Sequence, residues 1–122
     1  MIRRDRLAAL AALAIAKKDA DLARLAGVTA RLAAAACARD DLEASLLREM
    51  AKAMSEPEVP VLQALDVHVL MAEQARGALE ASISRIAGER DDLRRRCALS
   101  FGRAEVLGKL CEQTRRRAKA PD

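Results

Sequence analysis

The chain has 122 residues, of which 33% are charged and only one, Phe101, is aromatic. A globular core of this size normally relies on Phe, Tyr and Trp for bulk, so the composition argues against a compact multilayer fold. Abundant Ala, Leu, Arg and Glu with a net charge of +4 instead indicate long helices, and no apolar run approaches the ~20 residues that span a bilayer.

The first sixteen residues have two interpretations. Three arginines within the first six residues precede an apolar run from Leu7 to Ala16, which is the pattern of a secretory signal peptide. The alternative is the beginning of a long helix that stays in the mature protein. The run is mostly alanine and passes into charged sequence without a break. This favours a retained helix in a cytoplasmic protein.

A first helix is expected over residues 3–54, with an interrupted apolar repeat along one side. Steps of three and four residues give three blocks, with a shift of the repeat near Arg39. The blocks are Leu7, Leu10 and Ala14, then Leu22, Leu25, Thr29, Leu32 and Ala36, then Leu42, Leu46, Met50 and Met54.

The strongest helix-breaking signal of the chain lies at residues 55–60, where a turn is predicted. Pro57 and Pro60 each lack a backbone N–H and restrain the residue before them, so a continuous helix cannot contain both. Pro60 is suited to the first turn of a following helix.

A second helix is expected over residues 61–118. From Leu62, steps of three and four give a repeat that continues without a shift for more than seven heptads. Its positions are Leu62, Leu65, Val69, Ala72, Arg76, Leu79, Ile83, Ile86, Arg90, Leu93, Cys97, Ser100, Ala104, Leu107, Cys111 and Thr114. Two roles are open for its arginines, Arg76 and Arg90. They could pair with acids across the hairpin, Arg90 with Asp21 or a neighbour of it, or mark a place where the helices separate.

The predicted fold class is all-α: a single domain forming a long two-helix antiparallel coiled-coil hairpin. Two helices of similar length joined by a short turn must run antiparallel, which places residue i roughly opposite residue 115 − i. Cleavage after Ala16 would then leave the end of the second helix without a partner. In this register none of the cysteines faces another, so no disulfide is expected among Cys37, Cys97 and Cys111.

The sequence contains no recognisable catalytic constellation, so we expect no enzymatic activity, cofactor, metal or small-molecule substrate. The single histidine, His68, has no partner residue spaced for metal binding or for general base catalysis. Asp91 and Asp92 lie four residues before Arg95 and Arg96, which is typical of a solvated helix face.

Charge is distributed unevenly along the expected hairpin. Residues 40–66, near the turn, hold seven acids against two bases, whereas the two termini are basic. A rod with oppositely charged ends suits docking by one tip, although the charges could serve only to keep an alanine-rich rod soluble. The expected partner-binding surface is the basic end formed by Arg3, Arg4, Arg6, Arg115, Arg116 and Arg117. A second candidate partner face consists of apolar residues off the repeat, Leu99, Phe101, Val106 and Leu110.

As a hairpin with basic, clustered termini, the chain resembles the FliJ and YscO-type stalk proteins of flagellar and virulence-type (type III) secretion. The resemblance covers most of the chain and depends on its size, its opening RRDRLAALAALAIAKKDADLA and its closing SFGRAEVLGKLCEQTRRRAK. It implies a non-catalytic cytoplasmic component of the export apparatus, peripheral at the inner face of the membrane. The partners it implies are the export ATPase hexamer, engaged much as a γ-subunit coiled coil engages a rotary ATPase ring, the export gate protein and export chaperones. The basic end would then face the ATPase.

Two other classes of protein fit the same sequence. A dimerising scaffold or tether would pair two hairpins into a four-helix bundle through their alanine-rich faces. A nucleic-acid-binding protein would use the arginines to neutralise phosphates. The second class is disfavoured because no aromatic residues lie between the arginines to stack on bases, so no stable nucleic-acid partner is expected.

Overall fold

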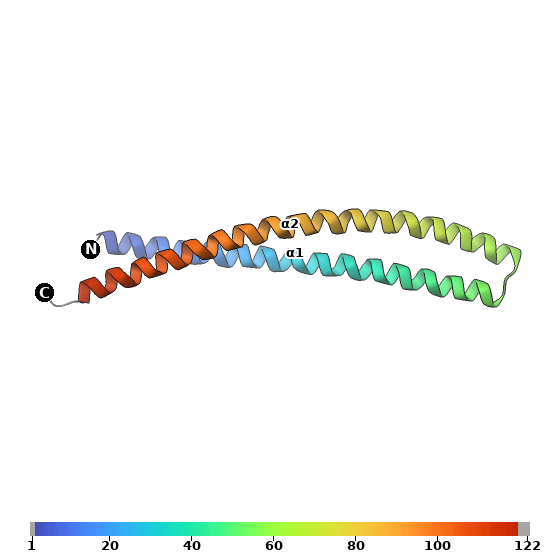
Figure 1. Ribbon diagram of the computed structural model, residues 1–122, viewed down its shortest axis with the longest axis horizontal. Coiled ribbons are helices and arrows are strands. Elements are labelled where there is room, and N and C mark those ends of the chain that lie inside the picture. The colour runs from blue at the N-terminus through green and yellow to red at the C-terminus, as the bar shows by residue number, and fades with distance from the viewer. Residues whose placement is uncertain (1, 120–122) are drawn as a thin grey trace. The chain divides into compact units, whose positions relative to one another are not determined.

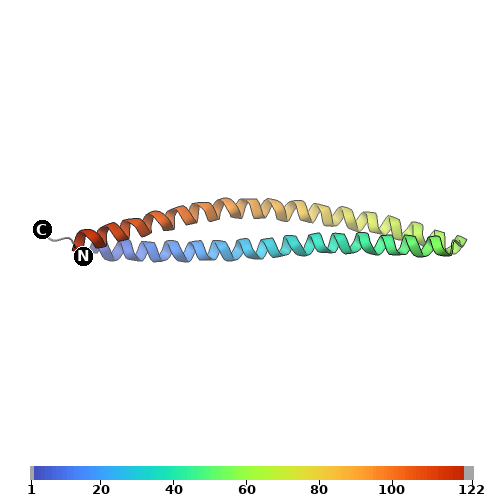
Figure 2. The same cartoon turned by 60° about the horizontal axis from the view of Figure 1, so that its bottom comes forward.

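The computed structural model describes residues 2–119, which form two helices and no strand. Helix α1 spans Ile2–Ser55 and helix α2 spans Val59–Lys119. These helices form two compact units, each containing a segment of α1 beside an antiparallel segment of α2 (Figures 1 and 2). Unit 1 contains residues 2–28 and 89–119, and unit 2 contains Thr29–Gly88 with the turn. The predicted all-α helical hairpin is confirmed.

The turn in unit 2 is shorter than predicted, covering residues 56–58 instead of 55–60. The N–H of Leu62 donates a hydrogen bond to the carbonyl of Glu58 at 2.9 Å, so Glu58 is the N-cap of α2. Pro60 therefore lies inside the first helical turn, where a backbone N–H has no acceptor within the helix. The missing N–H of Pro60 costs no hydrogen bond there, and α2 can begin before it.

The heptad repeat predicted for α2 is confirmed at nearly every position. All of its residues from Leu65 to Thr114 are buried or half-buried except Arg76, and Leu62 at the start is 38% exposed. The side of α2 that faces α1 in each unit is therefore the one that the apolar periodicity indicates.

The repeat predicted for α1 is partly wrong. Its covered positions follow one continuous pattern of three and four residues, with no shift near Arg39. They are Leu7, Ala11, Ala14, Lys18, Asp21, Leu25, Val28, Leu32, Ala35, Arg39, Leu42, Leu46, Glu49 and Ala53. Five residues assigned to the repeat are exposed instead: Leu10, Leu22, Thr29, Met50 and Met54. The covered side includes charged residues and many alanines. A repeat traced through the large apolar residues of α1 therefore falls on positions next to the covered ones.

The register also differs from the predicted pairing of i with 115 − i. In unit 1 Asp21 contacts Ser100 and Lys18 contacts Phe101, and in unit 2 Glu43 contacts Arg76. The two residue numbers of each pair total 119 to 121. Part of the difference arises because helical side chains tilt toward the N-terminus of their own helix. In an antiparallel pair the two sets of side chains tilt in opposite directions. Two side chains that touch therefore have residue numbers with a larger sum than two residues whose backbones lie directly opposite each other.

The apolar core of each unit is small. Among the described residues the buried hydrophobic side chains are Val28 and Cys97 in unit 1 and Ala53 and Ile86 in unit 2. Sixteen large hydrophobic side chains of the described residues are exposed, so much of their apolar surface is not covered by the other helix. No segment of the described helices is both long enough and apolar enough to cross a bilayer.

Candidate functional site

Arginines from the first and last turns of the described chain lie together at one end of unit 1. Arg4 and Leu7 of α1 line a shallow pocket with Cys111, Thr114 and Arg115 of α2, and the two helix ends lie close together (Figures 1 and 2). The packing of α1 against α2 thus brings the two arginine groups of the basic end to one place. The described residues of unit 1 include sixteen Lys and Arg against eight Asp and Glu, a net charge of +8, whereas unit 2 has a net charge of −3.

The six arginines of the basic end differ in how far they are neutralised. Nη2 of Arg115 lies 3.0 Å from Oε1 of Glu112, and Nε of Arg116 lies 3.4 Å from the same oxygen. The hydrogen bond from Arg115, followed by the charge of Arg115, holds the pKa of Glu112 below its usual range. Within residues 2–119 the other four, Arg3, Arg4, Arg6 and Arg117, form no ion pair. No acid among the described residues neutralises these four charges.

The second candidate face does not form one cluster. Leu99, Val106 and Leu110 are exposed by 61%, 57% and 42% and lie along one flank of α2. Phe101 follows Leu99 by two residues, which turns its side chain about 200° around the helix. It lies on the opposite flank, with Nζ of Lys18 5.3 Å from its ring centroid. The structure therefore separates Phe101 from the other three residues.

Two of these three residues line an apolar groove in unit 1, and the third lies beside it. Leu99 and Val106 line an open groove of about 470 Å³, and Leu110 lies one turn of α2 further along. The remaining lining residues are Ala14, Lys17, Ala98, Ser100, Gly102, Arg103 and Leu107. Leu10 and Leu13, which are 52% and 67% exposed, lie on the α1 side of this groove, since they precede Ala14 and Lys17 by four residues each. The sequence prediction missed this α1 contribution because Leu10 was assigned to the covered side.

A buried polar pair holds α1 against α2 beside the groove. Asp21 is fully buried and Ser100 is 4% exposed, and Oγ of Ser100 donates a hydrogen bond to Oδ2 of Asp21. Nζ of Lys17 and Nη1 of Arg24 lie 3.3 and 3.7 Å from Oδ1 of Asp21. The hydrogen bond from Ser100 is the main reason that the pKa of Asp21 is lowered, with further support from Lys17 and Arg24, and burial opposes it. Both oxygens of this carboxylate are thereby occupied.

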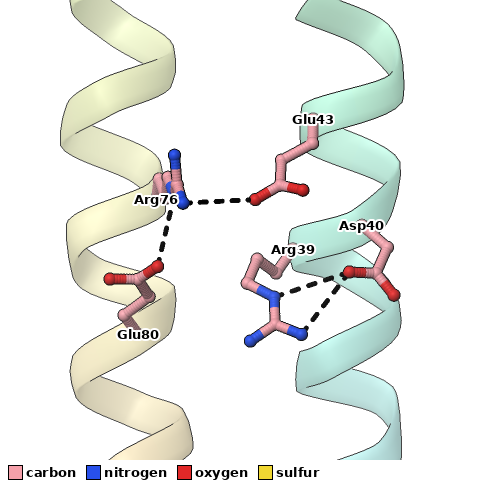
Figure 3. A network of polar contacts seen from close by, with 5 residues as sticks. All are labelled: Arg39, Asp40, Glu43, Arg76 and Glu80. Atoms are coloured by element: carbon pink, nitrogen blue, oxygen red, sulfur yellow. Dashed lines mark hydrogen bonds and ion pairs between the residues drawn. The ribbon is translucent and has the colours of Figure 1, made fainter.

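In unit 2, Arg76 connects the two helices through an ion-pair network (Figure 3). Nη2 of Arg76 lies 3.5 Å from Oε1 of Glu43 on α1, and its Nε lies 3.2 Å from Oε1 of Glu80 on α2. Pairing across the hairpin, one of the two roles open for this arginine, is thus observed. All three side chains are about half exposed, so the network contributes little to stability.

Arg90 behaves differently, and the pairing with Asp21, one of the possibilities left open for it, is not observed. Asp21 is bonded to Ser100, and Nη2 of Arg90 lies 3.4 Å from Asp91 on its own helix. Only 26% of the Arg90 side chain is exposed, and its Nε is buried with no hydrogen-bond partner. The arginine therefore occupies a covered position of α2 at some energetic cost.

Residues with metal-binding or nucleophilic side chains are dispersed. Residues 2–119 hold no group of three or more His, Cys, Asp or Glu arranged to bind a metal ion. His68 borders shallow hollows of unit 2 beside Glu49. The cysteines are free thiols, with Cys97 buried, Cys111 half-buried and Cys37 exposed.

No protein-family model, curated protein or solved structure matches this chain. The resemblance to the FliJ and YscO-type proteins therefore stays a prediction from the sequence.

Proposed function

We propose that this chain is a non-catalytic coiled-coil stalk of a flagellar or virulence-type protein export apparatus, in which the basic end of unit 1 engages the export ATPase ring. The observation that carries the proposal is that Arg4 and Arg115, from opposite ends of the chain, line one pocket. Four further arginines surround them in sequence, and within the described residues most of the six have no acidic partner. Such a concentration of cations favours docking on an acidic surface by this end.

In this role the protein acts in the cytoplasm at the inner face of the membrane, where its other partners are the export gate protein and export chaperones. Binding through unpaired arginines gains much of its strength from long-range attraction, so association with the ATPase is fast and weakens as salt screens the charges. The packing of α1 against α2 in unit 1 keeps both arginine groups in one place during the contact.

The test is ATP hydrolysis by the cognate flagellar export ATPase with and without this protein, alongside counting of rings by negative-stain microscopy. We expect faster turnover and more hexamers with the wild type, and loss of both effects when Arg115, Arg116 and Arg117 become alanine. The matched control replaces Arg94, Arg95 and Arg96, another arginine triplet of α2 in unit 1, and keeps the stimulation. Absence of any effect from a folded wild-type protein would contradict the stalk assignment.

The exposed apolar residues favour a second candidate, a dimerising scaffold or tether. Sixteen large hydrophobic side chains of the described residues are exposed, which leaves apolar surface that a second chain could cover. A second hairpin could cover part of them in a four-helix bundle. The mass in solution, measured by light scattering across a concentration series, separates a dimer from a single-chain stalk. A salt-dependent gel shift with DNA or RNA would instead revive the nucleic-acid alternative.

A further inference from the structure

We propose that the apolar groove of unit 1 is a docking site for an acidic amphipathic helix of a partner protein. This site is distinct from the basic end, and its test does not require an export ATPase. The groove has a volume of about 470 Å³ and is bordered by side chains from both helices of the unit.

The apolar residues around the groove repeat at helical spacing. On α2, Leu99, Val106 and Leu110 are separated by seven and four residues, and on α1, Leu10 and Leu13 are separated by three. All five are between 42% and 67% exposed. Two parallel rows of this kind, one on each helix, match the ridge that a third helix presents when it packs against a helix pair.

A helix also suits the groove better than an extended peptide does. An added strand needs a sheet edge with unpaired N–H and C=O groups. The part of unit 1 that the structure describes is entirely helical, so its backbone groups along the groove are already bonded within α1 and α2.

The charged residues on the groove side are cations. Steps of four and three along α1 pass through Arg6, Leu10, Leu13, Lys17, Ala20 and Arg24. The corresponding steps along α2, from Arg96 to Arg117, include Arg103 and no acid. Lys17 and Arg103 line the groove itself. The partner helix is therefore acidic beside its apolar stripe, because like charges along this surface would repel it.

The acids of unit 1 nearest in sequence are already paired or lie on other faces. Asp21 is buried against Ser100, and its Oδ1 lies 3.3 Å from Nζ of Lys17 and 3.7 Å from Nη1 of Arg24, so it neutralises these two cations in part. Oε1 of Glu105 lies 3.3 Å from Nζ of Lys109. Glu112 is bonded to Arg115. None of these carboxylates neutralises Arg103, which forms no ion pair among residues 2–119.

A second copy of this chain that docked groove to groove would bring two cationic surfaces together, which like charges oppose. Docking of the acidic unit 2 of one copy onto unit 1 of another would give a closed two-fold dimer or a filament, and the self-association measured below tests for both.

The experiment measures fluorescence polarisation of a labelled peptide of about 20 residues, long enough to become helical, with Leu at a and d positions and Glu at most others. Two matched peptides carry Lys in place of Glu, or Ser in place of Leu. The full chain should bind the acidic, Leu-containing peptide at least about tenfold more tightly than either control peptide. The preference over the Lys-containing peptide should decrease as salt rises from about 0.05 to 0.5 M, because salt screens the charges.

Two matched pairs of variants locate the site. Val106→Asp should weaken binding at least about tenfold, and Val67→Asp should not, although both valines lie on α2 and are 57% exposed. Arg103→Ala should weaken binding, and Lys109→Ala, which removes the same charge from α2, should not. Circular dichroism checks that each variant keeps its helices.

Four outcomes would overturn the proposal. They are no binding by the folded chain, equal binding of the acidic and basic peptides, equal loss in both members of a variant pair, and self-association that Val106→Asp abolishes. Binding to phosphatidylserine vesicles that needs Val106 and Arg103, without binding of the acidic peptide, would assign the groove to a lipid surface instead.

Discussion

Oγ of Ser100 on α2 donates a hydrogen bond to Oδ2 of Asp21 on α1, and both side chains are buried at positions where a coiled coil usually places apolar residues. Such polar pairs restrict the register of two helices, because any shift would leave the buried carboxylate without its donor. The Asp21–Ser100 pair therefore fixes how the α1 and α2 segments of unit 1 align, which in turn places the arginines of the basic end and both walls of the groove.

The first prediction concerns acid. The pKa of Asp21 in the folded chain lies below its ordinary value of 3.8, mainly because of the hydrogen bond from Ser100. A carboxylate whose pKa is lowered by folding stabilises the fold above its unfolded-state pKa, and this contribution disappears as pH falls through the folded-state pKa. We expect the melting temperature to fall as the pH is lowered from about 4, and Asp21→Asn to flatten that part of the curve. Asp19→Asn, at an exposed position, is the control and should leave the fall of the melting temperature below about pH 4 unchanged.

The second prediction concerns Ser100, which donates the hydrogen bond to Asp21. Ser100→Ala leaves Oδ2 of Asp21 buried without its hydrogen bond, so the pKa of Asp21 should rise toward its ordinary value and the melting temperature should fall. The pKa can be followed by NMR titration of the carboxyl carbon, and the stability by calorimetry. Ser84→Ala, at an exposed position of α2, provides the matched control. An unchanged Asp21 pKa in Ser100→Ala would show that Lys17 and Arg24 suffice to hold the carboxylate ionised.

The third prediction compares two adjacent leucines in α1. Leu46 is half-buried toward α2 in unit 2, whereas Leu47 is 66% exposed. Leu46→Ala removes contacts and leaves space between the helices, at a cost of about 2 kcal/mol in the free energy of unfolding. Leu47→Ala should change it by less than about 0.5 kcal/mol. Urea denaturation followed by circular dichroism measures both free energies of unfolding. An equal loss of stability in the two variants would contradict the finding that Leu46, and not Leu47, faces α2.

The difference between the two helices explains how far the sequence could predict the fold and the sites. In α2 the covered positions are mostly Leu, Ile, Val and Ala, so periodicity alone finds them, and Ser100 was placed correctly. In α1 the same pattern passes through Lys18, Asp21, Arg39 and Glu49, and a search for apolar residues cannot detect charged side chains that are covered by a partner helix. Part of the register error arose because residues with facing backbones were expected to have contacting side chains.

The candidate site shows the same limit. The arginines of the basic end could be grouped from the sequence, because any antiparallel hairpin brings its termini together. The groove could not, since it depends on which flank of each helix Leu13, Leu99 and Phe101 occupy. Phe101 lies near Leu99 in the sequence and on the other side of α2 in space.

The last prediction concerns Arg90, which occupies a covered position of α2 without the cross-helix partner that Arg76 has. Its side chain is 26% exposed and its Nε is buried with no hydrogen bond, so the fold bears the cost of removing that N–H from water. Leucine at this position would continue the apolar repeat between Ile86 and Leu93 and bury no polar atom. We therefore expect Arg90→Leu to stabilise the chain by about 1 kcal/mol, as substitutions of poorly satisfied buried polar groups often do. Arg94→Leu, at a position 60% exposed, should have almost no effect on the urea midpoint. A loss of stability in Arg90→Leu would instead show that the guanidinium stabilises the hairpin through Asp91 and its covered aliphatic stem.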